Sequence, residues 1–211
     1  MAAGVKALFG VGCKVKNSRK WQVAFVAGLL VLGVLFVFPG TGRSRAEDYR
    51  ILRCRMLARD FMAELRDELL TAIREQGPVS AVAVCRQLVP ELTARYSLPP
   101  GIDVKLTSWD CCNPANRPDA WEKRGMDLFS QRRRAGGVLA GMDYWQEVDG
   151  KAGPSFRYLR ALPTGSLCLQ CHGEHLRAKL RQALRRAGAG GQKKGSRLGE
   201  LRGVLSITLS P

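Results

Sequence analysis

The sequence has few acidic residues, few cysteines and only two histidines, and each shortage limits its chemistry. Eighteen Asp and Glu stand against 34 Lys and Arg, a formal charge of +16, which favours anionic partners such as acidic proteins or lipids. Seven cysteines are too few for a disulfide scaffold of this length. Two histidines, His172 and His175, leave few imidazole ligands for a metal. The chain also has no internal repeat.

Long apolar runs are absent except for one, residues 21–38, which is interrupted only by Gln22. Its length is close to the ~20 residues that cross a bilayer as a helix. Lysines and arginines precede it, so the positive-inside bias puts the N-terminus in the cytoplasm. A cleaved signal sequence is the alternative, but the run is long for one. The sequence predicts a basic cytoplasmic segment at 1–20, a transmembrane anchor or signal sequence at 21–40, and a periplasmic domain at 41–211, held at the cytoplasmic (inner) membrane.

The exported domain shows helical patterns first and strand patterns later. Apolar residues recur at helical spacing over 46–76 and 79–96, separated by Gly77-Pro78. Residues 102–107 alternate apolar and polar side chains, as a half-buried strand does. Further helices are expected at 119–134 and 174–186, and further strands at 144–148, 156–162 and 201–209. The mixture predicts an α+β domain whose antiparallel sheet carries flanking helices.

The strongest motif is Cys168-Leu-Gln-Cys171-His172. C-x-x-C-H is the attachment pattern of c-type haem: two thiols reach the porphyrin vinyl groups and the adjacent imidazole binds the iron. Structural zinc would need a further ligand pair, and Cys111-Cys112 is too closely spaced to provide it. A redox dithiol would be expected within a thioredoxin-like βαβ unit, which is absent. The motif predicts one covalent haem c, attached at Cys168 and Cys171, with His172 as proximal ligand.

The second axial position of that haem is left open by the residues alone. His175 lies three residues after His172, on the same side of the ring, and cannot reach the far face. The remaining candidates are a water, no ligand, one of the other cysteines, or one of the methionines Met56, Met62, Met126 and Met142.

Five segments carry a resemblance to a known group: 77–85, 113–122, 156–163, 168–173 and 199–206. In this order they resemble the PAS-like, single-haem c-type domains of bacteria, long catalogued as a family of unknown function. The resemblance extends from about Leu57 to Leu209. It implies a PAS-like fold, with one transmembrane helix preceding it here, and it implies that Cys85 is the distal iron ligand.

Some residues depart from the family pattern or have open roles. Cys54 and the pair Cys111-Cys112 are additional cysteines. A disulfide from Cys54 to one of the pair, or a replacement of Cys85 by one of these thiols, are both open. Three arginines are candidates to pair with haem propionates by charge-assisted hydrogen bonds, with a solvated surface position as the alternative: Arg117, Arg157 and Arg160.

A thiolate ligand predicts how such a haem would behave. Thiolate donates charge to ferric iron, so the reduction potential should be low. After reduction the thiolate loses electrostatic support, so the far face could open to a small gas. The sequence thus predicts a non-enzymatic haem-based redox or gas sensor, or a low-potential electron-transfer protein, with a membrane and a redox partner protein or small gas as partners. Export argues against nucleic acid. The alternative is a peroxidase-like haem enzyme or a small-molecule reductase, which would need a distal acid or base.

Overall fold

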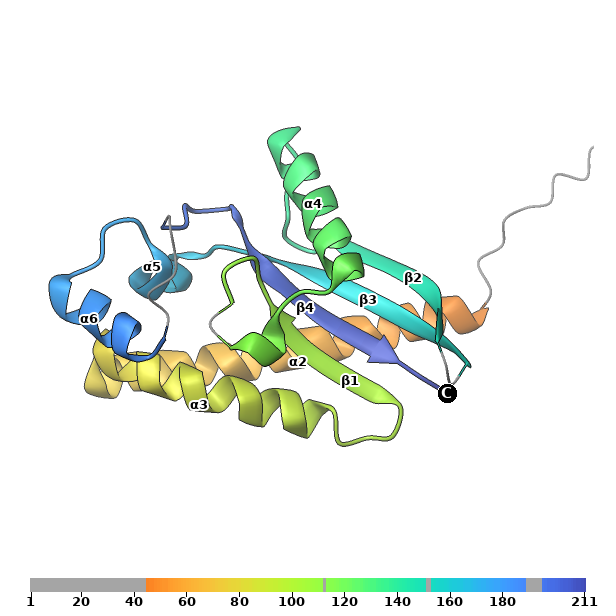
Figure 1. Ribbon diagram of the computed structural model, residues 1–211, viewed down its shortest axis with the longest axis horizontal. Helices are drawn as coiled ribbons and strands as arrows, with labels where there is room; N and C mark the ends of the chain where they lie inside the picture. Colours follow the sequence, from red (N-terminus) through yellow and green to blue (C-terminus); the bar gives the residue numbers. More distant parts are fainter. Residues whose placement is uncertain (1–44, 112, 151–152, 189–194) are drawn as a thin grey trace, which may run out of the picture. The chain divides into compact units, whose positions relative to one another are not determined.

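The structure, a computed structural model, describes residues 45–111, 113–150, 153–188 and 195–211 (Figure 1). The apolar run predicted as an anchor lies outside these residues. Within the described ranges, no helix is both long and apolar enough to cross a bilayer. The described elements form one compact unit, and in chain order they are α2 (Arg45–Gln76), α3 (Pro78–Tyr96), β1 (Ile102–Thr107), the short helix η1 (Pro114–Asn116), α4 (Ala120–Arg134), β2 (Asp143–Gly150), β3 (Gly153–Pro163), α5 (Ser166–His172), α6 (Ala178–Arg186) and β4 (Leu201–Leu209).

The four strands form one antiparallel sheet in the order β1-β4-β3-β2. The α+β class with an antiparallel sheet is therefore confirmed. The last strand of the chain, β4, lies between β1 and β3, as Figure 1 shows. The segment that contains α5 and α6 connects β3 to β4, so both ends of this segment are joined to the two central strands.

One face of the sheet is covered by a hairpin of α2 and α3. Gly77 joins the two helices with a φ of 82°, a conformation that glycine adopts without a Cβ penalty, and Pro78 begins α3. Every third or fourth residue of α2 points at the sheet, which produces a buried stripe. This stripe packs against inward side chains of the strands, and the core includes Ile51, Cys54, Phe61, Leu65, Phe156, Tyr158, Leu205 and Ile207.

The opposite face of the sheet is covered by α4. Its buried residues Trp121, Met126 and Phe129 pack against Leu159 and other residues of β3 and β4. Gly125 allows this close approach, because a Cβ at that position would lie 2.2 Å from Cδ1 of Leu159. Two packed layers of side chains therefore hold the sheet, one on each face.

The segment 113–122, one of the five family-like segments, fixes α4 to β1. Asp119 and Glu122 form a reciprocal capping box at the start of α4. Glu122 is 1% exposed, and its carboxylate also accepts from Nζ of Lys105 at 2.7 Å and lies 3.5 Å from Nη2 of Arg157. The segment thus has a structural role: its buried carboxylate joins the start of α4 to Lys105 of β1 and Arg157 of β3.

We expect Glu122→Ala to destabilise the fold strongly. The substitution removes a buried carboxylate and leaves Lys105 and part of Arg157 without their partner, which typically costs about 3 kcal/mol. Urea unfolding followed by circular dichroism would measure the loss. The control is Glu75→Ala, at an exposed position of α2, where a change of at most about 0.5 kcal/mol is expected. Equal midpoints for the two variants would contradict this account.

Candidate functional site

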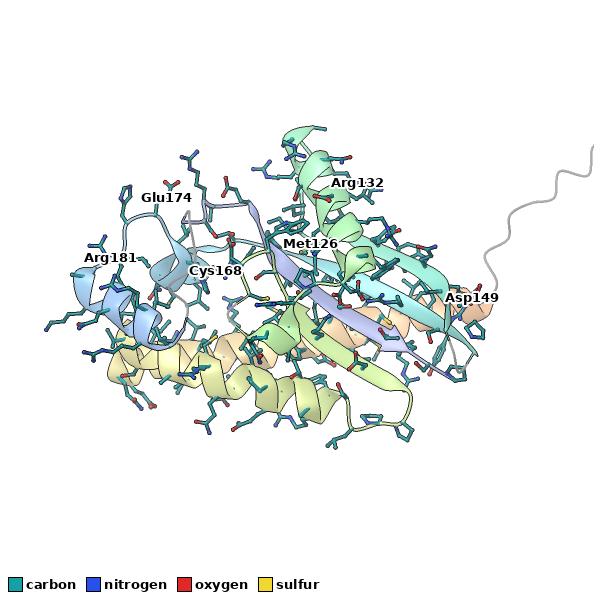
Figure 2. The ribbon with its side chains drawn as sticks, viewed as in Figure 1. Met126, Arg132, Asp149, Cys168, Glu174 and Arg181 are labelled. Atoms are coloured by element: carbon teal, nitrogen blue, oxygen red, sulfur yellow. The ribbon has the colours of Figure 1, made fainter. Side chains whose placement is uncertain are left out.

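The C-x-x-C-H motif forms a helix of its own, α5, which the sequence patterns did not predict. Residues three and four apart lie on one face of a helix, so Cys168, Cys171 and His172 share a face. The two thiols are half-buried and are not joined in a disulfide. Burial, and secondarily the neighbouring Cys168, raises the pKa of the Cys171 thiol. Figure 2 shows Cys168 on α5, beyond the end of the sheet where β3 ends and β4 begins.

The C-terminal end of α5 is fixed by close backbone packing. The N–H of Gly173 donates to the carbonyl of Leu169 at 3.1 Å, and a Cβ at Gly173 would come within 2.6 Å of that oxygen. The N–H of Ser196 donates to the carbonyl of His172 at 2.7 Å. A Cβ on Gly195 would lie 2.3 Å from Cα of Glu174. The chain that returns towards β4 therefore packs directly on the end of the motif.

The N-terminal end of α5 is tied to the same returning chain. Thr164 precedes the helix, and its N–H donates to the carbonyl of Glu200 at 2.7 Å. Its own carbonyl accepts from the N–H of Gly199 at 2.9 Å. An ion pair of 2.8 Å between Arg197 and Glu174 adds a side-chain contact. Both ends of the motif helix thus depend on the residues that lead into β4.

A β-bulge brings an arginine to the motif histidine. Leu162 pairs with Gly203 and Pro163 pairs with Leu201, so Arg202 is an extra residue opposite β3. Bulges redirect side chains at strand ends. Nη2 of Arg202 lies 3.1 Å from Nδ1 of His172. Since a guanidinium only donates, Nδ1 is the acceptor in this contact, and a neutral His172 ring carries its proton on Nε2; iron bound at Nε2 would take the place of that proton.

Cys85 lies on the helix that contacts α5. The inward face of α3 is marked by the buried residues Ala81, Val82 and Val89, and Cys85 lies at helical spacing between them. Cys85 is nevertheless only half-buried, although it packs against the core. Its thiol is therefore partly accessible to solvent, unlike the side chains of Ala81, Val82 and Val89.

These four residues fit the haem that the motif implies. The donor set contains two unbridged thiols and an imidazole on one helical face, with a third, accessible thiol on a neighbouring helix that contacts it. Thiols and imidazole are established ligands and attachment groups for haem. In the described part of the chain, no three Cys, His, Asp or Glu side chains come together in a group that could hold a metal ion.

Comparison with known proteins shows to which family the chain is related. The Tll0287-like family matches residues 46–210. The chain belongs to the Tll0287-like family. The resemblance inferred from the five sequence segments is thereby confirmed. A solved structure, the cyanobacterial heme-protein Tll0287, is similar at 18% identity and a TM-score of 0.47, covering 79% of this chain and 96% of that one. No curated protein matches.

Two of the arginines predicted to pair with propionates have other partners in this Tll0287-like chain. Arg157 lies on the α4 side of the sheet, 2.7 Å from Asp119 and 4.4 Å above the Trp121 ring. Arg160 pairs with Asp143 at 2.6 Å. Arg117 is exposed after η1. None of these contacts involves α5. Arg202, which the sequence analysis did not single out, is the arginine that contacts the motif.

The additional cysteines do not form the disulfide that was left open. Cys54 is fully buried on α2, in no disulfide, and burial raises the pKa of its thiol to about 12. It is therefore a core residue and an unreactive thiol. Cys111 is half-buried and also unbridged, while Cys112 lies outside the described residues.

The methionines considered as axial ligands are dispersed over the fold. Met126 belongs to the core between α4 and the sheet, on the face opposite α3 (Figure 2), and Met142 packs against the same core. Met62 packs in the α2–α3 core, and Met56 is exposed. α3, which carries Cys85, contacts α5 directly. This placement favours Cys85 among the candidates named from the sequence.

Proposed function

We propose that the chain is a membrane-anchored c-type haem protein whose PAS-like domain lies in the periplasm. One haem c is attached through Cys168 and Cys171, with His172 as proximal and Cys85 as distal iron ligand. The observation that carries the proposal is the pairing of α5 with α3: two unbridged thiols and an imidazole face one way on α5, and the helix it contacts presents an accessible thiol. The family link supports it, since Tll0287 itself is described as a heme-protein.

The residues around the proposed ligands favour redox function over catalysis. When bound, the haem supplies a one-electron iron centre. Cys85 as thiolate would stabilise the more positive ferric state and keep the potential low. A peroxidase or reductase would need an acid or base on the same side. The inward neighbours of Cys85 on α3, one turn before and after it, are the apolar Ala81, Val82 and Val89. We therefore infer a low-potential electron-transfer protein or a redox or gas sensor.

The spectrum of the full chain, matured in a host with haem-attachment machinery, tests this function. We expect a six-coordinate, low-spin ferric haem that stays with the polypeptide after denaturation and acid extraction. Pyridine haemochrome analysis measures the attached haem per chain. Purified protein that contains tightly bound zinc and no porphyrin would overturn the proposal.

Arg202 is expected to raise the reduction potential of this centre. Its guanidinium lies beside His172, and a nearby positive charge disfavours the ferric state, which carries one more positive charge than the ferrous state. Arg202→Gln should lower the midpoint potential by on the order of 50 mV, whereas Arg202→Lys should have a smaller effect. Redox titration followed in the visible spectrum measures the shift. The control is Arg132→Gln, at an exposed position of α4; a shift as large in this control would contradict a specific role for Arg202.

A further inference from the structure

The helix after the motif has an unusual concentration of positive charge. The segment 175–199 contains lysines and arginines but no Asp or Glu. Its described cations on and next to α6 are exposed: Arg177, Lys179, Arg181, Arg185 and Arg186. None of these five forms an ion pair with another residue in the described part of the chain.

A groove of about 580 Å³ lies where α6 packs on α3. Its apolar lining comes from small side chains, including Val79, Ala83 and Ala183. One guanidinium from each helix also lines it, Arg86 from α3 and Arg186 from α6. The groove is shallow and open, so it offers short apolar side chains a contact surface with two guanidinium groups at its edges.

The arrangement favours a protein partner over a lipid surface. Helices that insert into a membrane interface expose large apolar side chains next to their cations. The two leucines of α6 are turned inward instead: Leu180 is buried and Leu184 is half-buried. The exposed part of α6 is thus charged without a large apolar side chain to insert. An acidic protein segment, with carboxylates for the arginines and short apolar side chains for the groove, matches both features.

We infer that α6 and the α3–α6 groove form a docking surface for an acidic segment of a protein partner. This inference rests on the proposed function and specifies its partner, because the surface adjoins the proposed haem. α6 begins shortly after the motif helix, and α3 carries both Cys85 and one wall of the groove. A partner held there would lie next to both elements that carry the proposed iron ligands.

Charge reversal on α6 tests the docking surface. The variant is Arg181→Glu/Arg186→Glu, and the matched control is Arg132→Glu/Arg134→Glu, which makes the same change of net charge on exposed residues of α4. Figure 2 shows Arg181 on α6 and Arg132 on α4, which covers the opposite face of the sheet. The probe is a fluorescent peptide of alternating glutamate and alanine, and anisotropy measures its affinity for the full haem-loaded chain in non-ionic detergent. We expect a loss of at least tenfold for the α6 variant and a loss below threefold for the control, with affinity falling as salt rises.

Each other outcome has a defined meaning. Equal losses in the two variants would show a general effect of net charge and overturn the inference. Unchanged peptide binding, together with lost binding to phosphatidylglycerol vesicles, would overturn it in favour of a lipid surface. If the reversal variant fails to fold by circular dichroism, Arg181→Gln/Arg186→Gln replaces it under the same criteria. Attached haem is measured in the same samples, so absence of haem with retained peptide binding refutes the proposed function and leaves the docking surface standing.

Discussion

Replacing Cys168 and Cys171 together by serine is expected to abolish covalent haem attachment. The two sulfurs lie on one face of α5, and neither is consumed by a disulfide, so both are available for thioether bonds. Serine is close to cysteine in size, and the backbone hydrogen bonds at the two ends of α5, from Ser196 to His172 and between Thr164 and residues 199–200, involve neither side chain. The polypeptide should therefore fold while its attached haem falls to background. Haem staining after denaturing electrophoresis and pyridine haemochrome analysis measure the loss.

The matched control for this experiment is Cys111→Ser. Cys111 is half-buried and unbridged like the motif cysteines, but it lies in the loop after β1. Its substitution should leave attached haem unchanged. Haem that still resists acid extraction in the double serine variant would show that the attachment is elsewhere and refute the assignment of α5.

The second large effect is expected from Cys85→Ala. Loss of the thiolate removes a negative charge from the iron, so the ferric state loses stabilisation and the midpoint potential should rise by on the order of 100 mV. The Soret band should shift, because one axial ligand is lost. The fold should tolerate the change. Cys85 is only half-buried, so the substitution creates no enclosed cavity and should cost little stability. Redox titration and visible spectra of the ferric and ferrous forms measure both effects.

Two further variants sharpen the interpretation of Cys85. Cys85→Met supplies a neutral haem ligand, so it should restore a six-coordinate spectrum without restoring the low potential. Val84→Ala, at the neighbouring half-buried position, should change neither quantity. Should Cys85→Ala keep both the potential and the Soret band of the parent protein, Cys85 is not a ligand and another group occupies that axial position.

The class of the fold was predictable because most of its elements have strong local patterns. The apolar stripe of α2 and the alternation of Ile102, Val104 and Leu106 follow directly from helical and strand periodicity. The ends of helices and strands that are set by tertiary packing were harder to predict from the sequence. The helix predicted from residue 174 begins at Ala178, because Gly173 and Glu174 pack against residues 195–197 that lie far along the chain. The local sequence around residue 174 gives no indication of that contact.

The residues of the C-x-x-C-H motif could be predicted as site residues from the sequence, whereas the residues that contact the motif could not. Cys168, Cys171 and His172 are adjacent in sequence, so their spacing carries the information. Arg202 reaches His172 through a bulge, which depends on the pairing of two strands rather than on either strand alone. For Arg157 and Arg160, the sequence alone already argued against a shared role at one bound group. Residues three apart on a strand point to opposite faces, so the two could not be expected to serve one bound group.

The place of β4 in the sheet has a consequence for biogenesis. β4 is synthesised after the other three strands, yet it separates β1 from β3, and the residues just before it fix both ends of α5. Until this part of the chain has been made, the sheet lacks one of its two central strands and α5 lacks the contacts that hold its ends. An attachment enzyme that acts on unfolded substrate would have its opportunity in that interval, before β4 joins the sheet.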